Sequence, residues 1–364
     1  AAAFSNTLTA TSFNGIPFFT DVANNSMYTH NVSATDSTAA SNTAYGFAAM
    51  DAITTGDSNV AIGHQAGSLL NSGSGNTLIG KDAGDSLNTG GDNVAIGRDA
   101  LQNEDSGSRN VAIGVQALFS ANVNASAYNV AVGYQAGFNV STGLYNTILG
   151  GEALIANIDG DNNTAIGYQA LKSFEADADG HGNNTAVGSN ALRDSVTGTE
   201  NTAVGHFALG NGLVTGNNNV AVGRNAMLHS TSTAGSVAIG SEALGGGVTT
   251  GGNNIAVGAG AGKDITSGSK NVLVGSQAGT NLISGHSNTA IGHESLTTED
   301  ARAGATAVGY RALKLQNSDE NSFNTAMGYD AGVSITTGIN NALIGAYAGN
   351  AMVTDSRITA VGHK

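Results

Sequence analysis

Hydrophobic and polar positions alternate along most of this chain in a five-residue pattern that returns at a nearly fixed interval. The pattern is Asn, then usually Thr or Val, then Ala, then a branched apolar residue, then Gly, as in Asn163-Thr164-Ala165-Ile166-Gly167. Its glycine occurs nineteen times between Gly46 and Gly362, and thirteen of the eighteen intervals are 17 residues. Self-similarity at such a period predicts a repeat protein in which each unit packs on the next.

The three residues between Asn and Gly, here numbered positions two to four, are predicted to form a β-strand because they are rich in β-branched residues. Side chains alternate along a strand, so positions two and four share one face and position three lies on the other. Both faces are apolar, which favours burial on both sides. We expect the branched residues to fill a thin core. Alanine would then admit a close neighbour, either the return strand of the same coil or another copy of the chain.

The rest of each unit predicts a short return segment. Alanine stands three residues after the glycine in seventeen of eighteen units, as in Tyr168-Gln169-Ala170-Leu171, and predicts a second short strand. A glycine three residues before the next Asn, such as Gly73 or Gly268, is expected to supply a positive φ at a turn. The unit therefore predicts one rung of an all-β β-solenoid (β-roll) with about 19 rungs of mostly 17 residues, over residues 42–364.

Stacked rungs bring equivalent residues into register. Asparagine side chains at position one are expected to bond to one another from rung to rung, a structural role rather than ligand binding. The ladder positions singled out here are Asn59, Asn93, Asn163, Asn254, Gly63, Gly97, Gly167 and Gly258.

The two ends of the chain suggest contacts outside the repeat. Residues 1–41 carry an apolar patch and are expected to form a cap on the first rung or a segment that docks on a partner chain. The patch consists of Phe13, Ile16, Phe18 and Phe19. The last unit ends just after its first strand, and solenoid ends normally need capping. We therefore expect that end to be covered by another subunit, by a separate domain or by bundling.

Composition excludes several classes of function. The formal net charge is −14, so binding to nucleic acid phosphates is not expected. No run of 18 apolar residues occurs, so no membrane span is predicted. Only 5% of residues are aromatic and there are 53 glycines and no cysteine, which suits a thin repeated core without disulfides or thiolate chemistry.

Few residues are placed for catalysis. The longest unit carries Glu175, Asp177, Asp179 and His181, a weak candidate for a cation site that is more simply a solvated acidic loop. Four histidines follow the key glycine directly and are expected to face solvent: His64, His206, His293 and His363. Glu152 and Glu242 share a register but lie five rungs apart, too far for a glycosidase pair. No cofactor and no enzymatic activity are expected.

Two stretches carry a resemblance. Ser236-Val237-Ala238-Ile239-Gly240-Ser241-Glu242-Ala243 resembles the head repeat of trimeric autotransporter adhesins, which are left-handed β-rolls in which three chains pack side by side. Asn163-Thr164-Ala165-Ile166-Gly167-Tyr168-Gln169-Ala170-Leu171 is similar to repeats of phage tail fibres and bacterial surface proteins. The rung here is longer than the adhesin head repeat.

The resemblance implies a left-handed coil and a homotrimer, with an end-to-end filament and a monomer as alternatives. We expect a non-enzymatic extracellular structural fibre or adhesin, at a cell or virion surface, whose partners are itself and a cell-surface or glycan receptor. The alternative is a phage tail-fibre or spike segment with glycan-binding or polysaccharide-degrading activity.

Overall fold

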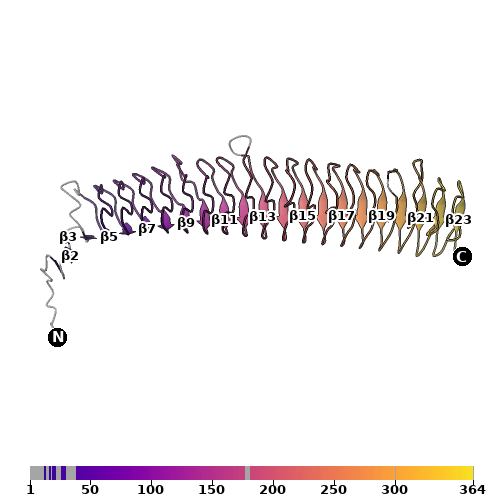
Figure 1. Ribbon diagram of the computed structural model, residues 1–364, viewed down its shortest axis with the longest axis horizontal. Helices are drawn as coiled ribbons and strands as arrows, with labels where there is room; N and C mark the ends of the chain where they lie inside the picture. Colours follow the sequence, from indigo (N-terminus) through magenta and orange to yellow (C-terminus); the bar gives the residue numbers. More distant parts are fainter. Residues whose placement is uncertain are drawn as a thin grey trace, which may run out of the picture. The chain divides into compact units, whose positions relative to one another are not determined.

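The computed structural model describes residues 12–13, 16–17, 19–21, 26–29, 38–176, 181–299 and 301–363. Regular secondary structure in these ranges consists of β-strands, each followed by a loop that leads to the next strand (Figure 1). The chain divides into two units, residues 1–163 with 178–181 and residues 164–177 with 182–364, which are described separately.

The described residues of the first unit form eleven strands. Two of them, β1 (Ser12–Phe13) and β2 (Ile16–Pro17), form an antiparallel pair, and β3 (Phe19–Asp21) pairs antiparallel with β4 (Ser26–Tyr28). From β4 onward each strand pairs in parallel with the next in chain order. The later strands are β5 (Thr43–Tyr45), β6 (Val60–Ile62), β7 (Thr77–Ile79), β8 (Val94–Ile96), β9 (Val111–Ile113), β10 (Val130–Val132) and β11 (Thr147–Leu149).

The second unit holds twelve strands, all parallel and paired in chain order. They are β12 (Thr164–Ile166), β13 (Thr185–Val187), β14 (Thr202–Val204), β15 (Val220–Val222), β16 (Val237–Ile239), β17 (Ile255–Val257), β18 (Val272–Val274), β19 (Thr289–Ile291), β20 (Thr306–Val308), β21 (Thr325–Met327), β22 (Ala342–Ile344) and β23 (Thr359–Val361). Equivalent residues pair throughout, so that Ala165 lies opposite Ala186. The predicted all-β solenoid with a period of about 17 residues is confirmed.

Each rung has one strand, and the predicted second strand is wrong. The segment after the key glycine is a series of turns in which every second residue has a positive φ, as at Gly63 (137°), Gln65 (54°) and Gly67 (58°). Its amides still bond to neighbouring rungs: the Gln65 N–H donates to the Phe47 carbonyl at 2.9 Å, and the Gly67 N–H to the Ala83 carbonyl at 2.9 Å. These bonds satisfy the backbone without the extended dihedrals of a strand.

The assignment of the two strand faces is also reversed. Position three is the buried one: Ala165 is fully buried, whereas Thr164 and Ile166 on either side of it are partly exposed. Ala170 and Leu171, from the turn segment of the same rung, are fully buried too. The interior is so thin that alanine, not a branched residue, fits on its strand side, and the branched residues form the outer face of the sheet.

Side-chain size is compensated across this thin interior. Where position three is Leu273, the turn residues that face it are Gly262 and Gly279. A Cβ atom at these glycines would lie 2.7 Å from Cδ1 and 2.6 Å from Cδ2 of Leu273. Leu78 stands in the same relation to Gly67 and Gly84. In these two layers a large side chain on the strand is therefore matched by glycine at the turn positions that face it.

Glycine is required where backbones of successive rungs meet. Gly258 directly follows β17 and has a φ of 138°, and a Cβ atom there would lie 2.5 Å from the carbonyl carbon and oxygen of Gly275. The glycine before the next Asn has a different role from the one predicted. Gly268 has no positive φ, but an added Cβ would lie 2.6 Å from the Gly285 carbonyl oxygen, so close stacking excludes a side chain.

The parallel ladder begins at β4, within the segment 1–41. The antiparallel strand β3 lies along the edge of β4 that faces away from β5. Of the apolar patch, the backbone of Phe13, Ile16 and Phe19 lies in β1, β2 and β3, but their side chains, and the whole of Phe18, lie outside the described residues. Their docking role stays a prediction.

Candidate binding surface

The asparagines of position one are buried and bonded. Asn271 donates its backbone N–H to Oδ1 of Asn254 at 3.1 Å, and its side-chain Nδ2 to the same atom at 3.0 Å. The same Nδ2 donates to the Gly285 carbonyl at 2.8 Å, and Oδ1 of Asn271 accepts from the N–H of Asn288 at 2.9 Å. The Asn271 amide is thus buried and bonded at both of its polar atoms, which indicates a structural role for the ladder.

Among the described residues, two fully buried carboxylates, Glu104 and Glu299, interrupt the apolar interior. Glu104 stands at a place that holds leucine in the preceding rung, Leu87, and is 0% exposed. Its Oε1 atom accepts hydrogen bonds from the N–H of Gly107 at 2.7 Å and of Val123 at 3.1 Å. Burial raises the pKa of Glu104, and the backbone bonds offset only part of that effect.

The proposed cation cluster is not assembled by the residues that can be placed. Asp177 and Asp179 lie outside the described residues. Glu175 is half-buried in the second unit and His181 is exposed in the first. Within the described ranges no group of three metal-ligating side chains comes together.

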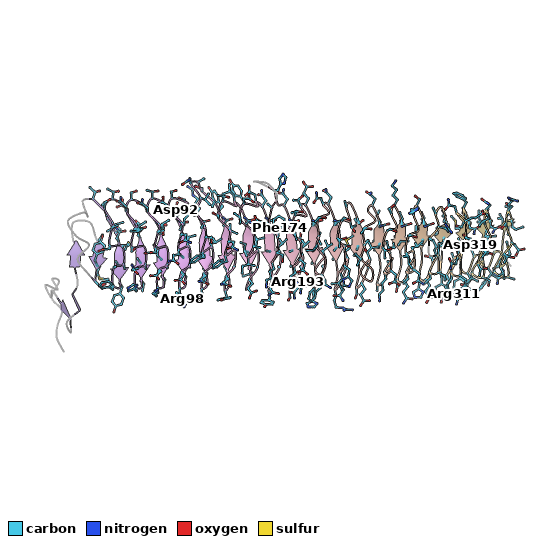
Figure 2. The ribbon with its side chains drawn as sticks, turned by 45° about the horizontal axis from the view of Figure 1, so that its top comes forward. Asp92, Arg98, Phe174, Arg193, Arg311 and Asp319 are labelled. Carbon is cyan, nitrogen blue, oxygen red and sulfur yellow. The ribbon has the colours of Figure 1, made fainter. Side chains whose placement is uncertain are left out.

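Variable side chains gather on what we call the turn surface, formed by the first and second residues after the key glycine of each rung. In the first unit, Arg98 lies at the edge where the strands end, opposite Asp92 (Figure 2). In the second unit Arg311 lies on the corresponding edge. His64, His206, His293 and His363 all belong to this surface and are exposed, as expected.

Aromatic rings stack from rung to rung on part of the turn surface. His293 stacks on Tyr310 with centroids 5.5 Å apart, and Tyr310 stacks on Tyr329 at 4.9 Å. The guanidinium of Arg311 lies over the Tyr310 ring and forms two hydrogen bonds, of 2.8 and 2.6 Å, to the carboxylate of Asp330. The rings shield each other's faces and leave their edges exposed.

In one rung, the second residue of the turn surface has no side chain. Gly260 is the only glycine among the residues that stand second after the key glycine, and it lies between Glu242 and Gln277 on the adjacent rungs. The residues that stand first in these three rungs are also small: Ser241, Ala259 and Ser276. Over these three rungs the first position of the turn surface therefore carries only small side chains, and the second position carries no side chain at Gly260.

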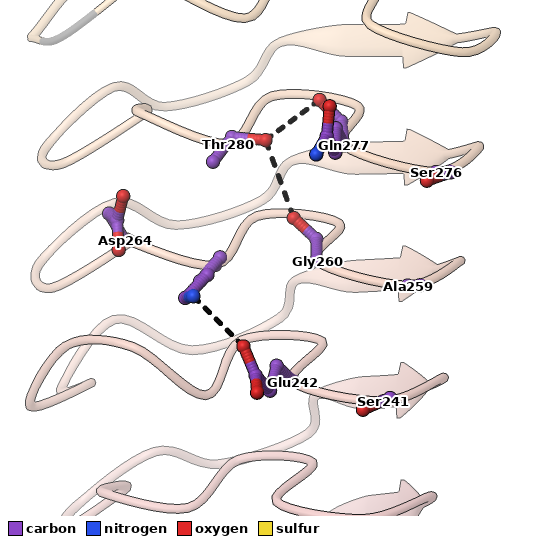
Figure 3. Close-up of a pocket in the computed structure, with 9 residues that line it drawn as sticks. Ser241, Glu242, Ala259, Gly260, Asp264, Ser276, Gln277 and Thr280 are labelled. Atoms are coloured by element: carbon purple, nitrogen blue, oxygen red, sulfur yellow. Dashed lines mark hydrogen bonds and ion pairs between the residues drawn. The ribbon is translucent and has the colours of Figure 1, made fainter.

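A hollow of about 470 Å³ occupies this gap (Figure 3). It is lined by Ser241, Glu242, Ala259, Gly260, Lys263, Asp264, Ser276, Gln277 and Thr280. Glu242 forms ion pairs with Lys263 at 2.9 Å and with Arg224 at 2.8 Å. The Thr280 hydroxyl bonds to the Gln277 carbonyl at 2.8 Å.

The charges around the hollow balance. Hydrogen bonds from Lys263 and then Arg224 lower the pKa of Glu242, and the bond to Glu242 raises the pKa of Lys263. Two cations, Arg224 and Lys263, thus face two carboxylates, Glu242 and Asp264. The sequence-based predictions did not include this site. Its signal in the sequence is the single glycine among the second residues after the key glycine, which is visible when the units are aligned.

No family model matches the chain, and no curated protein matches it. None of the residues described here forms a helix long and apolar enough to cross a membrane.

Proposed function

We propose that the chain is a non-enzymatic scaffold of an extracellular fibre or adhesin, and that its copies associate side by side through the outer face of the parallel sheet. Attachment to a partner then falls to the variable residues of the turn surface. The proposed location at a cell or virion surface follows from the resemblance of the repeats to those of adhesins and tail fibres.

The apolar outer face of the sheet carries this proposal. Position four is apolar in every rung, and position two is Val, Thr, Ile or Ala. In the single chain these side chains remain partly in contact with solvent; Ile239 is 40% and Ile255 41% exposed. Parallel sheets are normally covered on both faces, and contiguous exposed apolar surface marks sites of association. A second copy offers a matching apolar row at the same spacing.

The number of copies is proposed to be three. A homotrimer places three such sheet faces around one axis, which is the arrangement that the resemblance to adhesin heads implies. An end-to-end filament is the alternative, and it would leave the sheet face uncovered.

Polysaccharide cleavage is not favoured at the hollow around Gly260. A glycosidase needs one carboxylic acid with a raised pKa to protonate the leaving group. The pKa of Glu242 is lowered by Lys263 and Arg224, which keeps this carboxylate ionised. These groups suit binding rather than hydrolysis.

Solution mass tests the association. The chain has a mass of 36.0 kDa, so light scattering of a trimer gives about three times that value. We expect the Ile239→Glu/Ile255→Glu variant to dissociate, because it places charge on the apolar face. Leu213→Glu is the control, since Leu213 is 67% exposed in a loop outside the strands. A monomeric wild-type chain, or equal masses for both variants, would contradict the proposal.

Electron microscopy separates the trimer from the filament. Particles of one uniform length are expected for side-by-side association. Long fibres with an axial repeat near one subunit would favour end-to-end assembly instead.

A further inference from the structure

We propose that the hollow around Gly260 is a binding slot for a single residue of a neutral saccharide. This proposal rests on the attachment role given above and specifies where attachment takes place and which ligand chemistry it selects.

The slot has room because one side chain is missing from a regular row. A Cβ atom added to Gly260 would meet only the Cγ atom of Gln277, at 3.8 Å. Rungs lie about 4.8 Å apart, so the gap between Glu242 and Gln277 spans about two rungs, or roughly 10 Å. The volume of about 470 Å³ lies within the usual range of small-ligand pockets.

The lining groups select a ligand rich in hydroxyls. Acceptors are supplied by the carboxylates of Glu242 and Asp264, and donors by the ammonium of Lys263 and the amide of Gln277. A sugar hydroxyl both donates and accepts, so it can bond to either kind of group. The side chains around the slot are almost all polar, which disfavours an apolar ligand.

Charge selects a neutral ligand. An anion would approach the Lys263 ammonium only beside the carboxylates of Glu242 and Asp264. A cation would have to compete with Lys263 and Arg224, which already form ion pairs with Glu242. Because the two cations and two carboxylates balance, an uncharged polar ligand is not repelled by either pair.

The aromatic stack ends next to the slot. The ring of His293 stacks on Tyr310 on one side. The preceding residue in the same row is Ser276, on the adjacent rung, as the 3.1 Å bond from the Glu294 N–H to the Ser276 carbonyl shows. Ser276, which lines the slot, brings no ring to that side, so on that side the His293 ring of the adjacent rung is not covered by another ring. The C–H face of a pyranose ring can pack against such a ring face.

A substitution that fills the slot with a side chain of the protein tests the proposal. Gly260→Gln supplies the side chain that neighbouring rungs carry at this register, as at Gln277, where φ is 59°. The fold therefore accepts the change. Ala48→Gln is the matched control, because it adds the same side chain at the other small residue of this register, in the first unit. The probe is a printed array of neutral and sialylated oligosaccharides, followed by titration of each glycan retained.

We expect the wild-type chain and Ala48→Gln to bind a neutral glycan, and Gly260→Gln to bind it at least tenfold more weakly. Binding of sialylated glycans alone, no binding of a neutral glycan by the wild type, or equal binding by Gly260→Gln would overturn the proposal. Light scattering of the same samples separates the two proposals. A wild-type chain that assembles but binds no neutral glycan overturns the slot alone, and a monomeric chain that binds overturns the assembly alone.

Discussion

The Nδ2 group of Asn271 donates to Oδ1 of Asn254 across one rung boundary, at 3.0 Å, and to the carbonyl of Gly285 on the following rung, at 2.8 Å. One side chain thus ties together three successive rungs. Both polar atoms of the Asn271 amide are used inside a region closed to water. Equivalent bonds run from Asn42 to Asn163 in the first unit and from Asn184 to Ala305 in the second, where alanine supplies no side-chain acceptor.

Removing this side chain should loosen the rungs around it. Asn271→Ala leaves the Asn288 N–H and the Gly285 carbonyl without their partner, and each buried unpaired group costs about 1–3 kcal/mol. We expect faster amide exchange at Asn288, measured by hydrogen exchange because a long repeat need not unfold in one step.

Serine serves as the graded control at the same position. The hydroxyl of Ser236 accepts the Asn254 N–H at 3.1 Å in the place of an asparagine oxygen. Asn271→Ser should therefore protect Asn288 better than Asn271→Ala does. Equal exchange rates in the two variants would show that the acceptor at this position is unimportant.

Gly258→Ala should be strongly destabilising. The substitution forces a φ of 138° on alanine and places Cβ 2.5 Å from the Gly275 backbone, and backbone strain of this kind alone costs about 1–3 kcal/mol. The denaturant midpoint should fall. Gly260→Ala is the control: its φ is 66° and its Cβ meets only the Gln277 Cγ atom, at a van der Waals distance of 3.8 Å, so it should shift the midpoint much less. Similar shifts would contradict the stacking argument.

The match between large strand residues and turn glycines in the core predicts that a second substitution can restore stability lost by the first. Leu273→Ala removes the large side chain between Gly262 and Gly279 and should lower the free energy of unfolding by about 2–5 kcal/mol. Gly262→Ala should restore part of the loss, because the contact of its Cβ with Leu273 is removed and its remaining close contacts, 2.9 Å to Cδ2 of Leu244 and 3.0 Å to Cδ1 of Ile265, are with the flexible ends of side chains. A double variant no more stable than Leu273→Ala in urea would count against this complementarity.

Glu104 should make stability depend on pH. Its folded pKa is raised above the ordinary value of 4.5, so the folded chain binds this proton more tightly than the unfolded chain does. The contribution of protonated Glu104 to the stability of the fold is fully present below pH 4.5, and it is lost as pH rises through the pKa of Glu104 in the folded chain. Glu104→Gln cannot ionise, so it should gain stability relative to wild type as pH rises from 4.5 to 7. A difference constant across that range would refute the assignment.

The periodicity of the sequence was enough to predict the architecture. A strand with two apolar faces recurs every 17 residues, with Asn before it and Gly after it, and such a strand can bury its side chains only by stacking on its own copies. The strand positions, their parallel register and the asparagine ladder therefore follow from the repeated five-residue pattern. The hollow at Gly260 does not follow from the pattern of one rung, because a gap exists only relative to the side chains of the rungs on either side.

What tertiary structure alone decided is the direction in which each rung turns. Alternation shows that Ala165 and Ile166 point to opposite faces, but not which face is the interior. That choice depends on the turn after Gly167, where residues such as Gln169 and Leu171 take positive φ values that their side chains alone disfavour. Hydrogen bonds and packing with neighbouring rungs hold them there. The resulting turns place alanine in the interior and leave the branched residues on the outer face of the sheet, where a second copy can cover them.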